Sequence, residues 1–191
     1  MRVIAFHGSP RKDGNSSILL GEAIRGVEEA GQAVRVFKLA QMKIRPCLNC
    51  GKCEEAGECV IQDDEMGKIY AALREADRII LASPIFFSGL PAQAKAMIDR
   101  CQALWCEKYL LKREIPAGPA GRRGLFLTVG GMKMLKHAEC ANSTVTAFFR
   151  SVSVPEHAFL PFRGVDAKGA IRQHPTALQE AFEAGRALVA T

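Results

Sequence analysis

The sequence lacks any run that approaches the ~20 consecutive apolar residues of a membrane-spanning helix. Its first six residues, MRVIAF, also lack the basic segment, the long apolar stretch and the small-residue cleavage site of a secretory signal peptide. Both absences favour a cytoplasmic chain with no membrane span. Thiols are normally reduced in the cytoplasm, so disulfides are disfavoured.

Blocks of like charge are also absent. The net charge of +6 arises from 26 Lys and Arg against 20 Asp and Glu, with no block of five or more like charges. This modest excess gives nucleic-acid binding little support, and a site for small anions such as phosphates accounts for the same charge. Hydrophobic residues make up 48% and charged residues 24%, which excludes a disordered tail, a collagen-like chain and a coiled coil. A chain of 191 residues fits one domain spanning residues 1–191.

Two common nucleotide-binding fingerprints are missing as well. The dinucleotide motif G-x-G-x-x-G does not occur in the expected loop. Gly8 and Gly14 are separated by five residues and Asn15 follows, whereas a P-loop has one residue fewer between its glycines and a Lys after the second. The sequence therefore carries no information on nicotinamide specificity.

What is present is an alternation of strand and helix patterns along the chain. Strands are expected at residues 2–6, 33–39, 77–82, 124–129 and 153–160. Helices are expected at about residues 18–30, 65–75, 91–101, 137–151 and 175–190, with a turn at 118–123. Strands that are apolar throughout are typical of a sheet covered by helices on both faces. The predicted fold class is therefore α/β, a doubly wound five-stranded parallel sheet that binds ligands at the carboxyl ends of its strands.

The loop after the first strand has the composition of a phosphate site. It leads from a buried strand to a helix N-terminus, where unpaired backbone N–H groups and the helix dipole favour an anion. Arg11 can clamp a phosphate with two donors. The other candidate donors are hydroxyl and amide side chains, namely Ser9, Asn15, Ser16 and Ser17. The alternative is a solvated loop with an N-cap from Asn15 or Ser16.

These residues resemble those of a known family. Residues 8–17, GSPRKDGNSS, resemble the FMN phosphate loop of the flavodoxin-like NAD(P)H-dependent FMN reductases. Residues 83–100 resemble the flavin-ring loop and following helix of that family, and residues 128–131 resemble its third flavin loop. The resemblance covers most of residues 1–150. It implies a flavodoxin-like sheet that binds FMN, with NAD(P)H as a candidate electron donor.

The two ring loops are expected to supply the floor and the polar edge contacts of a flavin. The residues concerned are Pro84, Ile85, Phe86, Phe87, Ser88, Gly89, Thr128, Gly130 and Gly131. The family usually has an aromatic residue, often Tyr, near Phe86, and Phe keeps the ring contact without the hydroxyl. Core packing is the alternative for both phenylalanines. An ordinary turn is the alternative for the glycine pair, which permits close backbone approach to a ring.

Cysteine is the residue in surplus. Four of the seven lie within 13 residues, with the spacing Cys47-x2-Cys50-x2-Cys53-x5-Cys59. This tight spacing suits the thiolate ligands of a [4Fe–4S] cluster, all supplied by one local segment. Zinc, thiols without metal and disulfides are the alternatives, and zinc sites more often separate two C-x2-C pairs by a longer loop. The other three are expected to be buried small residues, namely Cys101, Cys106 and Cys140.

With flavin motifs on both sides, the cysteine run resembles the iron–sulfur flavoproteins, a branch of the same reductase family. In that branch a compact cysteine motif binds a [4Fe–4S] cluster next to FMN. The resemblance implies that the four clustered cysteines are the ligands and that residues 43–64 form a Cys-rich loop insertion after the second strand. It also implies a homodimer or homotetramer, with ferredoxin or another one-electron carrier as a candidate partner.

The sequence thus predicts an FMN-dependent oxidoreductase that passes electrons between FMN and a [4Fe–4S] cluster, with no acid–base side chain required. One alternative is an NAD(P)H-dependent FMN or quinone reductase without a cluster. The other is a flavodoxin-like binding or regulatory protein that uses the cysteine segment to contact a partner or nucleic acid. The few basic residues there are balanced by acidic ones, which counts against nucleic acid.

Overall fold

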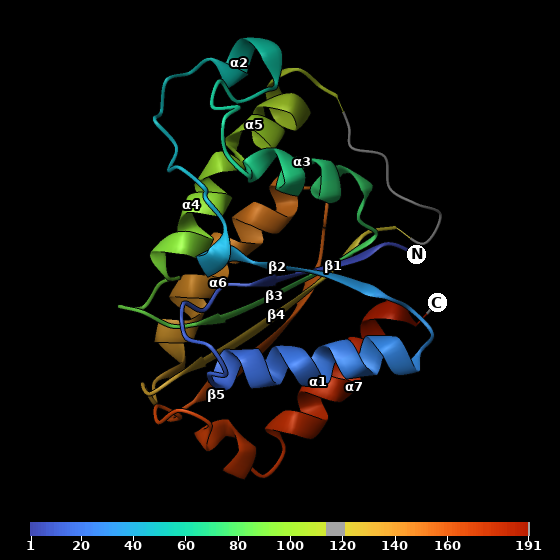
Figure 1. Cartoon of the computed structure of the whole chain (residues 1–191), viewed down its shortest axis with the longest axis vertical. Coiled ribbons are helices and arrows are strands. Elements are labelled where there is room, and N and C mark those ends of the chain that lie inside the picture. The colour runs from blue at the N-terminus through green and yellow to red at the C-terminus, as the bar shows by residue number, and fades with distance from the viewer. Residues whose placement is uncertain (114–120, 191) are drawn as a thin grey trace.

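The sheet has five parallel strands in the order β2-β1-β3-β4-β5 (Figure 1). A computed structural model describes residues 1–113 and 121–190. Its strands are β1 Val3–His7, β2 Val34–Lys38, β3 Arg78–Pro84, β4 Arg123–Gly130 and β5 His157–Arg163. This order, with its switch point between β1 and β3, is that of the flavodoxin-like doubly wound fold. The predicted fold class is therefore confirmed.

Helices cover both faces of the sheet. The α-helices are α1 Asn15–Glu29, α2 Cys53–Ala56, α3 Met66–Glu75, α4 Ala92–Arg100, α5 Gln102–Trp105, α6 Leu135–Ser151 and α7 Ala177–Val189. Shorter turns are the 3₁₀ segments η1 Leu39–Gln41 and η3 Ala170–Gln173, and the π-helical turn η2 Cys106–Leu110. In Figure 1, α1 and α7 lie on one side of the sheet, and α3, α4 and α6 lie on the other.

Alternating side chains of the strands build two cores, one on each face of the sheet. In β1, Ile4 and Phe6 enter the core shared with α3, α4 and α6, whereas Val3 and Ala5 enter the core shared with α1 and α7. This follows from the two-residue repeat of a strand, which points successive side chains to opposite faces. Burial of each large apolar side chain contributes about 1.5–3 kcal/mol. Packing in the two cores holds the strands in position, and with them the edge of the sheet where the strands end.

Helices α1 and α7 cross at two glycines. A Cβ atom on Gly26 would overlap the carbonyl oxygen of Phe182, and one on Gly185 would overlap that of Ala23. The helix backbones therefore touch, and only glycine leaves room for this contact. The contact packs the C-terminal helix against the helix that follows the phosphate-loop candidate.

The largest boundary difference from the sequence prediction concerns the last strand. It was expected at residues 153–160 but begins at His157. The preceding helix closes through a hydrogen bond of 2.8 Å from the backbone N–H of Val154 to the carbonyl of Phe149. Ser153 adopts a left-handed conformation with φ 60°. These residues therefore end a helix and do not begin a strand.

The cysteine-rich segment follows β2 and η1, as expected from its place in the sequence. Residues 43–64 are irregular backbone apart from the single helical turn of α2. Figure 1 shows this segment with α2 reaching beyond the sheet toward the end of the molecule where α5 lies. The turn expected at residues 118–123 lies in part outside the described residues.

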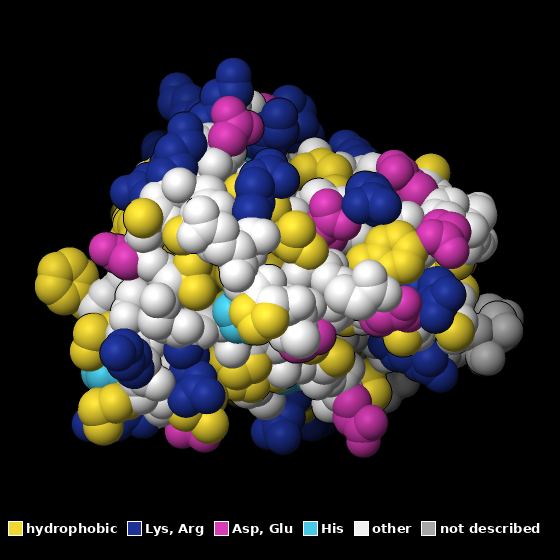
Figure 2. All heavy atoms as spheres, turned by 90° about the horizontal axis from the view of Figure 1, so that it is seen from below, with side chains coloured by type: hydrophobic (Ala, Val, Ile, Leu, Met, Phe, Trp, Pro, Cys, Tyr) yellow, Lys and Arg dark blue, Asp and Glu magenta, His cyan; other side chains and the backbone are white. Residues whose placement is uncertain are grey.

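The surface carries mixed charges. Figure 2 shows one face, on which Lys and Arg side chains spread among acidic and apolar ones and form no single stripe. Within residues 1–113 and 121–190, no helix is long and apolar enough to cross a membrane.

Candidate functional site

Three loops meet at one edge of the sheet because they follow neighbouring strands. The loops begin after His7 of β1, Pro84 of β3 and Gly130 of β4. The first is tied to β3 by a hydrogen bond of 2.8 Å from the N–H of Gly8 to the carbonyl of Ala82. A Cβ on Gly8 would lie 3.2 Å from that carbonyl oxygen, so glycine permits this close approach. The sequence prediction that these loops share one edge is borne out by the strand order.

The N-terminus of α1 has no side-chain cap. Gly14 stands at the cap position. The first helical hydrogen bond, of 3.1 Å, runs from the N–H of Ile18 to the carbonyl of Gly14. The backbone N–H groups before it, at residues 15–17, have no partner within the helix. The end of the helix dipole adds partial positive charge at the same place, as a phosphate site requires.

The side chain of Asn15 has a structural task. Its Nδ2 donates to the carbonyl of Ala167 at 2.9 Å, and its Oδ1 accepts from the N–H of Ile171 at 3.3 Å. These bonds tie the start of α1 to η3, about 150 residues away along the chain. These bonds use Oδ1 and one of the two N–H groups of Nδ2, so the role of Asn15 as a side-chain donor to a ligand stays a prediction.

The other loop residues are arranged around the helix start. Ser9 is buried, and its Oγ accepts from the N–H of Arg11 at 3.1 Å, which shapes the turn. Ser16 is also buried. The Arg11 side chain is exposed and has no hydrogen bond or ion pair to any residue that the structure describes. Its guanidinium is thus available to a ligand.

His7 and Ser17 form a polar pair beneath this loop. The Nε2 atom of His7 lies 2.6 Å from the Oγ atom of Ser17. Burial, together with the charge of Lys38, lowers the pKa of His7 below its ordinary value. The imidazole is therefore neutral near pH 7, and it supports Ser17 through a hydrogen bond without adding a charge.

The second loop presents its two phenylalanines to solvent. Phe86 and Gly89 exchange backbone hydrogen bonds of 2.9 Å in a tight turn. The central residues, Phe87 and Ser88, have φ 49° and φ 61°, a conformation that L-residues rarely adopt. Phe87 is fully exposed and Phe86 is about half exposed at 47%. Core packing, the alternative for both rings, is wrong.

A histidine of α6 braces this turn. The Oγ atom of Ser88 lies 2.5 Å from Nδ1 of His137. Sequence reasoning did not select His137, because the contact joins residues 49 positions apart. Pro84 and Ile85 leave β3 beside β4, and the N–H of Ile85 donates to the carbonyl of Val129 at 3.0 Å.

The third loop is shaped by backbone contacts. Thr128 is buried, and its hydroxyl donates to the carbonyl of Ser83 at 2.9 Å, so its side chain joins β4 to β3. A Cβ on Gly130 would lie 3.2 Å from Cβ of Ile85, and one on Gly131 would lie 3.1 Å from Cβ of Asp166. The glycines therefore allow the loops to pack closely. Thr128 contributes to the site through the backbone it positions.

The four clustered cysteines line one cavity. Its walls include Cys47, Cys50, Cys53 and Cys59. Gly51 and Gly57 both adopt left-handed conformations, which turn the chain back on itself between the thiols. All seven cysteines are free thiols, and within the described residues no group of three or more Cys, His, Asp or Glu side chains stands in metal-binding geometry. Four thiols around one cavity are the donor set that an iron–sulfur cluster requires.

A fifth thiol lies beside this cavity. Sγ of Cys106, on the π-helical turn η2, is 3.7 Å from Sγ of Cys53. Burial and this neighbour raise the pKa of Cys53 to about 12, so a metal must displace its proton to bind. Cys101 and Cys106 are buried as predicted, whereas the prediction for Cys140 is wrong because that thiol is exposed. Spacing gave no signal for Cys106, since it approaches Cys53 from η2 and not from the cysteine segment.

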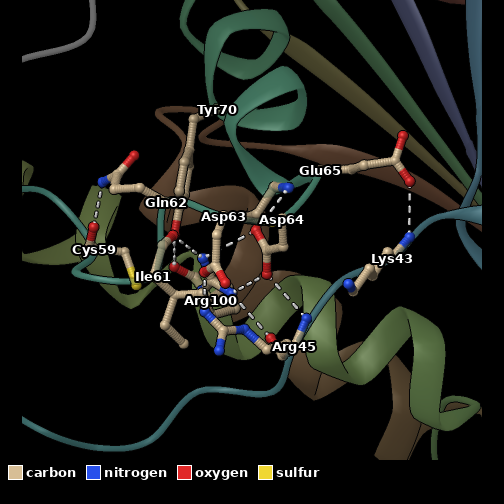
Figure 3. A network of polar contacts seen from close by, with 11 residues as sticks. Lys43, Arg45, Cys59, Ile61, Gln62, Asp63, Asp64, Glu65, Tyr70 and Arg100 are labelled. Carbon is tan, nitrogen blue, oxygen red and sulfur yellow. Dashed lines mark hydrogen bonds and ion pairs between the residues drawn. The ribbon is translucent and has the colours of Figure 1, made fainter.

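Arg100, the last residue of α4, holds both ends of the cysteine segment (Figure 3). Its Nη1 donates to the carbonyl of Arg45 at 3.0 Å, and its Nη2 donates to the carbonyl of Ile61 at 2.9 Å. Its Nη1 also lies 2.7 Å from Oδ2 of Asp64, and both side chains of this ion pair are buried. Arg100 lines the cysteine cavity as well.

Arg100 and Asp64 each stabilise the charged form of the other. Burial alone would raise the pKa of Asp64, but hydrogen bonds from Arg100 and from the N–H groups of Arg45 and Met66 hold it below its ordinary value. Burial would likewise lower the pKa of Arg100, but Asp64 holds it above its ordinary value. Asp64 also accepts a 3.0 Å hydrogen bond from the N–H of Met66, the first residue of α3.

Helix α4 connects the two candidate cofactor sites. It begins at Ala92, just after the flavin-ring loop, and ends at Arg100 on the wall of the cysteine cavity. Nine helical residues rise about 14 Å along the axis. Figure 1 shows α4 leading from the loop edge of the sheet toward α2 and α5.

Comparison with known proteins agrees with this geometry. A family model described as NADPH-dependent FMN reductase matches residues 1–163. Curated relatives include an iron–sulfur flavoprotein of Methanocaldococcus jannaschii, 41% identical over 54% of this chain and 53% of its own length. Another, from Methanosarcina thermophila, is 35% identical over 70% of this chain and 65% of its own length. The matched regions thus span about half to two thirds of these relatives.

Solved structures show the same fold. An NAD(P)H:quinone oxidoreductase from Methanothermobacter marburgensis superposes with a TM-score of 0.75 at 22% identity, covering 100% of this chain and 97% of its own. An FMN-dependent NADH-azoreductase from Bacillus anthracis, solved with FMN, gives a TM-score of 0.71 at 14% identity, covering 100% of both chains. The sequence match over residues 1–163 decides the family. The chain belongs to the NADPH-dependent FMN reductase family of flavin-dependent oxidoreductases.

Proposed function

We propose that this protein binds FMN and a [4Fe–4S] cluster and transfers electrons between them. The observation that carries the proposal is that four cysteines line one cavity, at the opposite end of α4 from the flavin-ring loop. The curated relatives named iron–sulfur flavoprotein support it. Bound FMN supplies two-electron redox chemistry, and a cluster supplies one-electron transfer.

In this proposal the edge loops bind the flavin. The free N–H groups at residues 15–17 and the guanidinium of Arg11 hold the phosphate, and Ser9 and Ser17 complete the loop. The backbone of residues 84–89 and the glycine pair at 130–131 border the ring. Exposed Phe86 and Phe87 then provide apolar surface beside the flavin.

The cysteine segment binds the cluster through Cys47, Cys50, Cys53 and Cys59. The roles of partner molecules follow from this chemistry: NAD(P)H as a candidate two-electron donor, and ferredoxin or another one-electron carrier as a candidate partner. We further propose that residues 1–191 form one FMN-binding domain in which residues 43–64 are the insertion, that the protein is cytoplasmic, and that it forms a homodimer or homotetramer.

Anaerobic purification followed by absorption spectroscopy tests the proposal. Wild-type protein is expected to show flavin bands together with broad iron–sulfur absorption that dithionite bleaches. Cys50→Ser is expected to keep the flavin bands and lose the broad absorption, whereas Cys140→Ser, which alters an exposed thiol outside the cavity, keeps both. Flavin bands without iron–sulfur absorption in the wild type would refute the cluster and favour an FMN reductase without one. A colourless protein that takes up no FMN would refute both the cluster and FMN binding.

The second candidate is an NAD(P)H-dependent FMN or quinone reductase whose cysteines carry no cluster. It is favoured by one observation: the four thiols share a cavity without being drawn into metal-binding geometry. A binding or regulatory protein without redox activity is the remaining alternative. Metal analysis of anaerobic protein separates the first candidate from the second.

A further inference from the structure

The wall of the cysteine cavity contains a buried guanidinium with one donor unused. Arg100 has five N–H groups. Those on Nη1 and Nη2 are directed to Arg45, Ile61 and Asp64. Its Nε atom is buried and has no hydrogen-bond partner among the described residues. A buried donor without a partner is unfavourable, and a group bound in the adjacent cavity would satisfy it.

The position of Arg100 distinguishes it from another buried arginine. Arg78 on β3 also has one buried nitrogen, Nη2, without a partner. Its other nitrogens bond the carbonyls of Leu188, Asp77 and Gly121. Of these two arginines, only Arg100 is part of the cavity that the four cysteines line. Arg78 therefore serves as a matched control.

We propose that Arg100 sets the reduction potential of the metal–thiolate group in the cysteine cavity and positions its loop. This inference rests on the proposed cluster. The guanidinium charge stabilises the negative charge that four thiolates bring, and the Nε–H is the donor left for a cluster sulfur. The bonds to Arg45 and Ile61 hold the chain on both sides of the cysteine run.

Arg100 and its buried partner Asp64 carry opposite charges, so their removal should change the reduction potential in opposite directions. An arriving electron makes the cluster more negative, so a nearby positive charge favours the reduced form and raises the potential. Asp64, 2.7 Å from Nη1, offsets part of that charge. Removing the positive charge must therefore lower the potential, whereas neutralising Asp64 must raise it. A purely structural role predicts no such opposition.

An anaerobic redox titration, monitored by visible absorption and electron paramagnetic resonance, tests the predicted changes in potential. The variants are Arg100→Gln, Asp64→Asn and Arg78→Gln. At a fixed potential, we expect the ratio of reduced to oxidised cluster to fall about tenfold in Arg100→Gln, which corresponds to 59 mV for one electron. The ratio should rise in Asp64→Asn. Arg78→Gln should match the wild type.

A fourth variant tests positioning. Arg100→Lys keeps the charge but cannot reach both carbonyls, so its potential should stay near that of the wild type. Its iron should be lost several-fold faster to the ferrous chelator bipyridyl. Loss of iron at the wild-type rate would overturn the positioning part.

The outcomes separate the two proposals. A wild-type protein without iron overturns the proposed cluster and this inference with it. An iron-containing wild type whose Arg100→Gln and Asp64→Asn variants shift in the same direction, or do not shift, overturns the inference alone. If Arg100→Gln retains no cluster, Asp64→Asn decides: an upward shift supports the inference, and an unchanged or lowered potential refutes it.

Discussion

Arg100 and Asp64 form a buried ion pair with Nη1 2.7 Å from Oδ2. The pair joins the end of α4 to the two flanks of the cysteine segment, because Arg100 bonds the carbonyls of Arg45 and Ile61 and Asp64 accepts the N–H of Arg45. This pair and its bonds (Figure 3) therefore hold the backbone on both sides of the four cysteines.

Breaking this pair should destabilise the cluster-free protein strongly. Arg100→Met leaves Asp64 as an uncompensated buried charge, and such losses cost about 3–5 kcal/mol. Urea unfolding of the cluster-free protein measures the change. Lys95→Met, which removes an exposed ion pair with Asp99, is the control and should change the free energy of unfolding by less than about 1 kcal/mol. Equal effects of the two substitutions would contradict a buried, structural pair.

The pH dependence of stability should carry the signature of Asp64. Its pKa is lowered in the folded protein, so the folded state holds that proton less readily than the unfolded chain does. The contribution is complete above the ordinary carboxyl pKa and is lost as the pH falls through the lowered value. The difference in unfolding free energy between wild type and Asp64→Asn should therefore shrink from about pH 4 downward. A difference that stays constant on acidification would refute this assignment.

The crossing of α1 and α7 should tolerate no side chain at Gly185. Alanine there would overlap the backbone at Ala23, and overpacking of this kind costs about 1–3 kcal/mol or more. Gly21, in the partner helix α1, has open space around its Cβ position, so Gly21→Ala should stabilise the protein by up to about 1 kcal/mol. Thermal unfolding compares the two. Similar melting temperatures for both variants would show that the helices do not cross as described.

Arg11 should distinguish FMN from riboflavin. If its exposed guanidinium binds the phosphate, Arg11→Ala should weaken FMN binding by about 10- to 100-fold, the range of a charge-assisted hydrogen bond. Riboflavin, which has no phosphate, should bind both proteins equally. Calorimetry with each ligand measures this, with the exposed Arg172→Ala as control. An equal loss of affinity for both ligands would show that Arg11 contacts the flavin ring or stabilises the fold, and does not bind the phosphate.

Local patterns in the sequence predicted the frame of the protein well. The central strands β1, β3 and β4 were recognisable because they are buried on both faces and therefore mostly apolar. Their carboxyl ends placed the three loops at one edge, and the helix start after Gly14 pointed to an anion site. The spacing of the cysteines placed them in one segment, and the structure shows that they also share one cavity.

Contacts between distant residues were beyond sequence reasoning. Arg100 was only a basic residue near a helix end, and its pairing with Asp64 spans 36 positions. Cys106 reaches Cys53 across 53 positions from a π-helical turn that no spacing rule indicates. The amide of Asn15 bonds Ala167 and Ile171, more than 150 positions away along the chain, which no local pattern indicates. Such pairings depend on how elements pack, which periodicity does not encode.

The iron and sulfide content of anaerobically purified wild-type protein decides whether the four clustered cysteines bind a [4Fe–4S] cluster. We expect about four iron and four sulfide per chain, lost together in Cys50→Ser and retained in Cys140→Ser. Zinc in place of iron, or neither metal with all seven cysteines titrating as thiols, would contradict it.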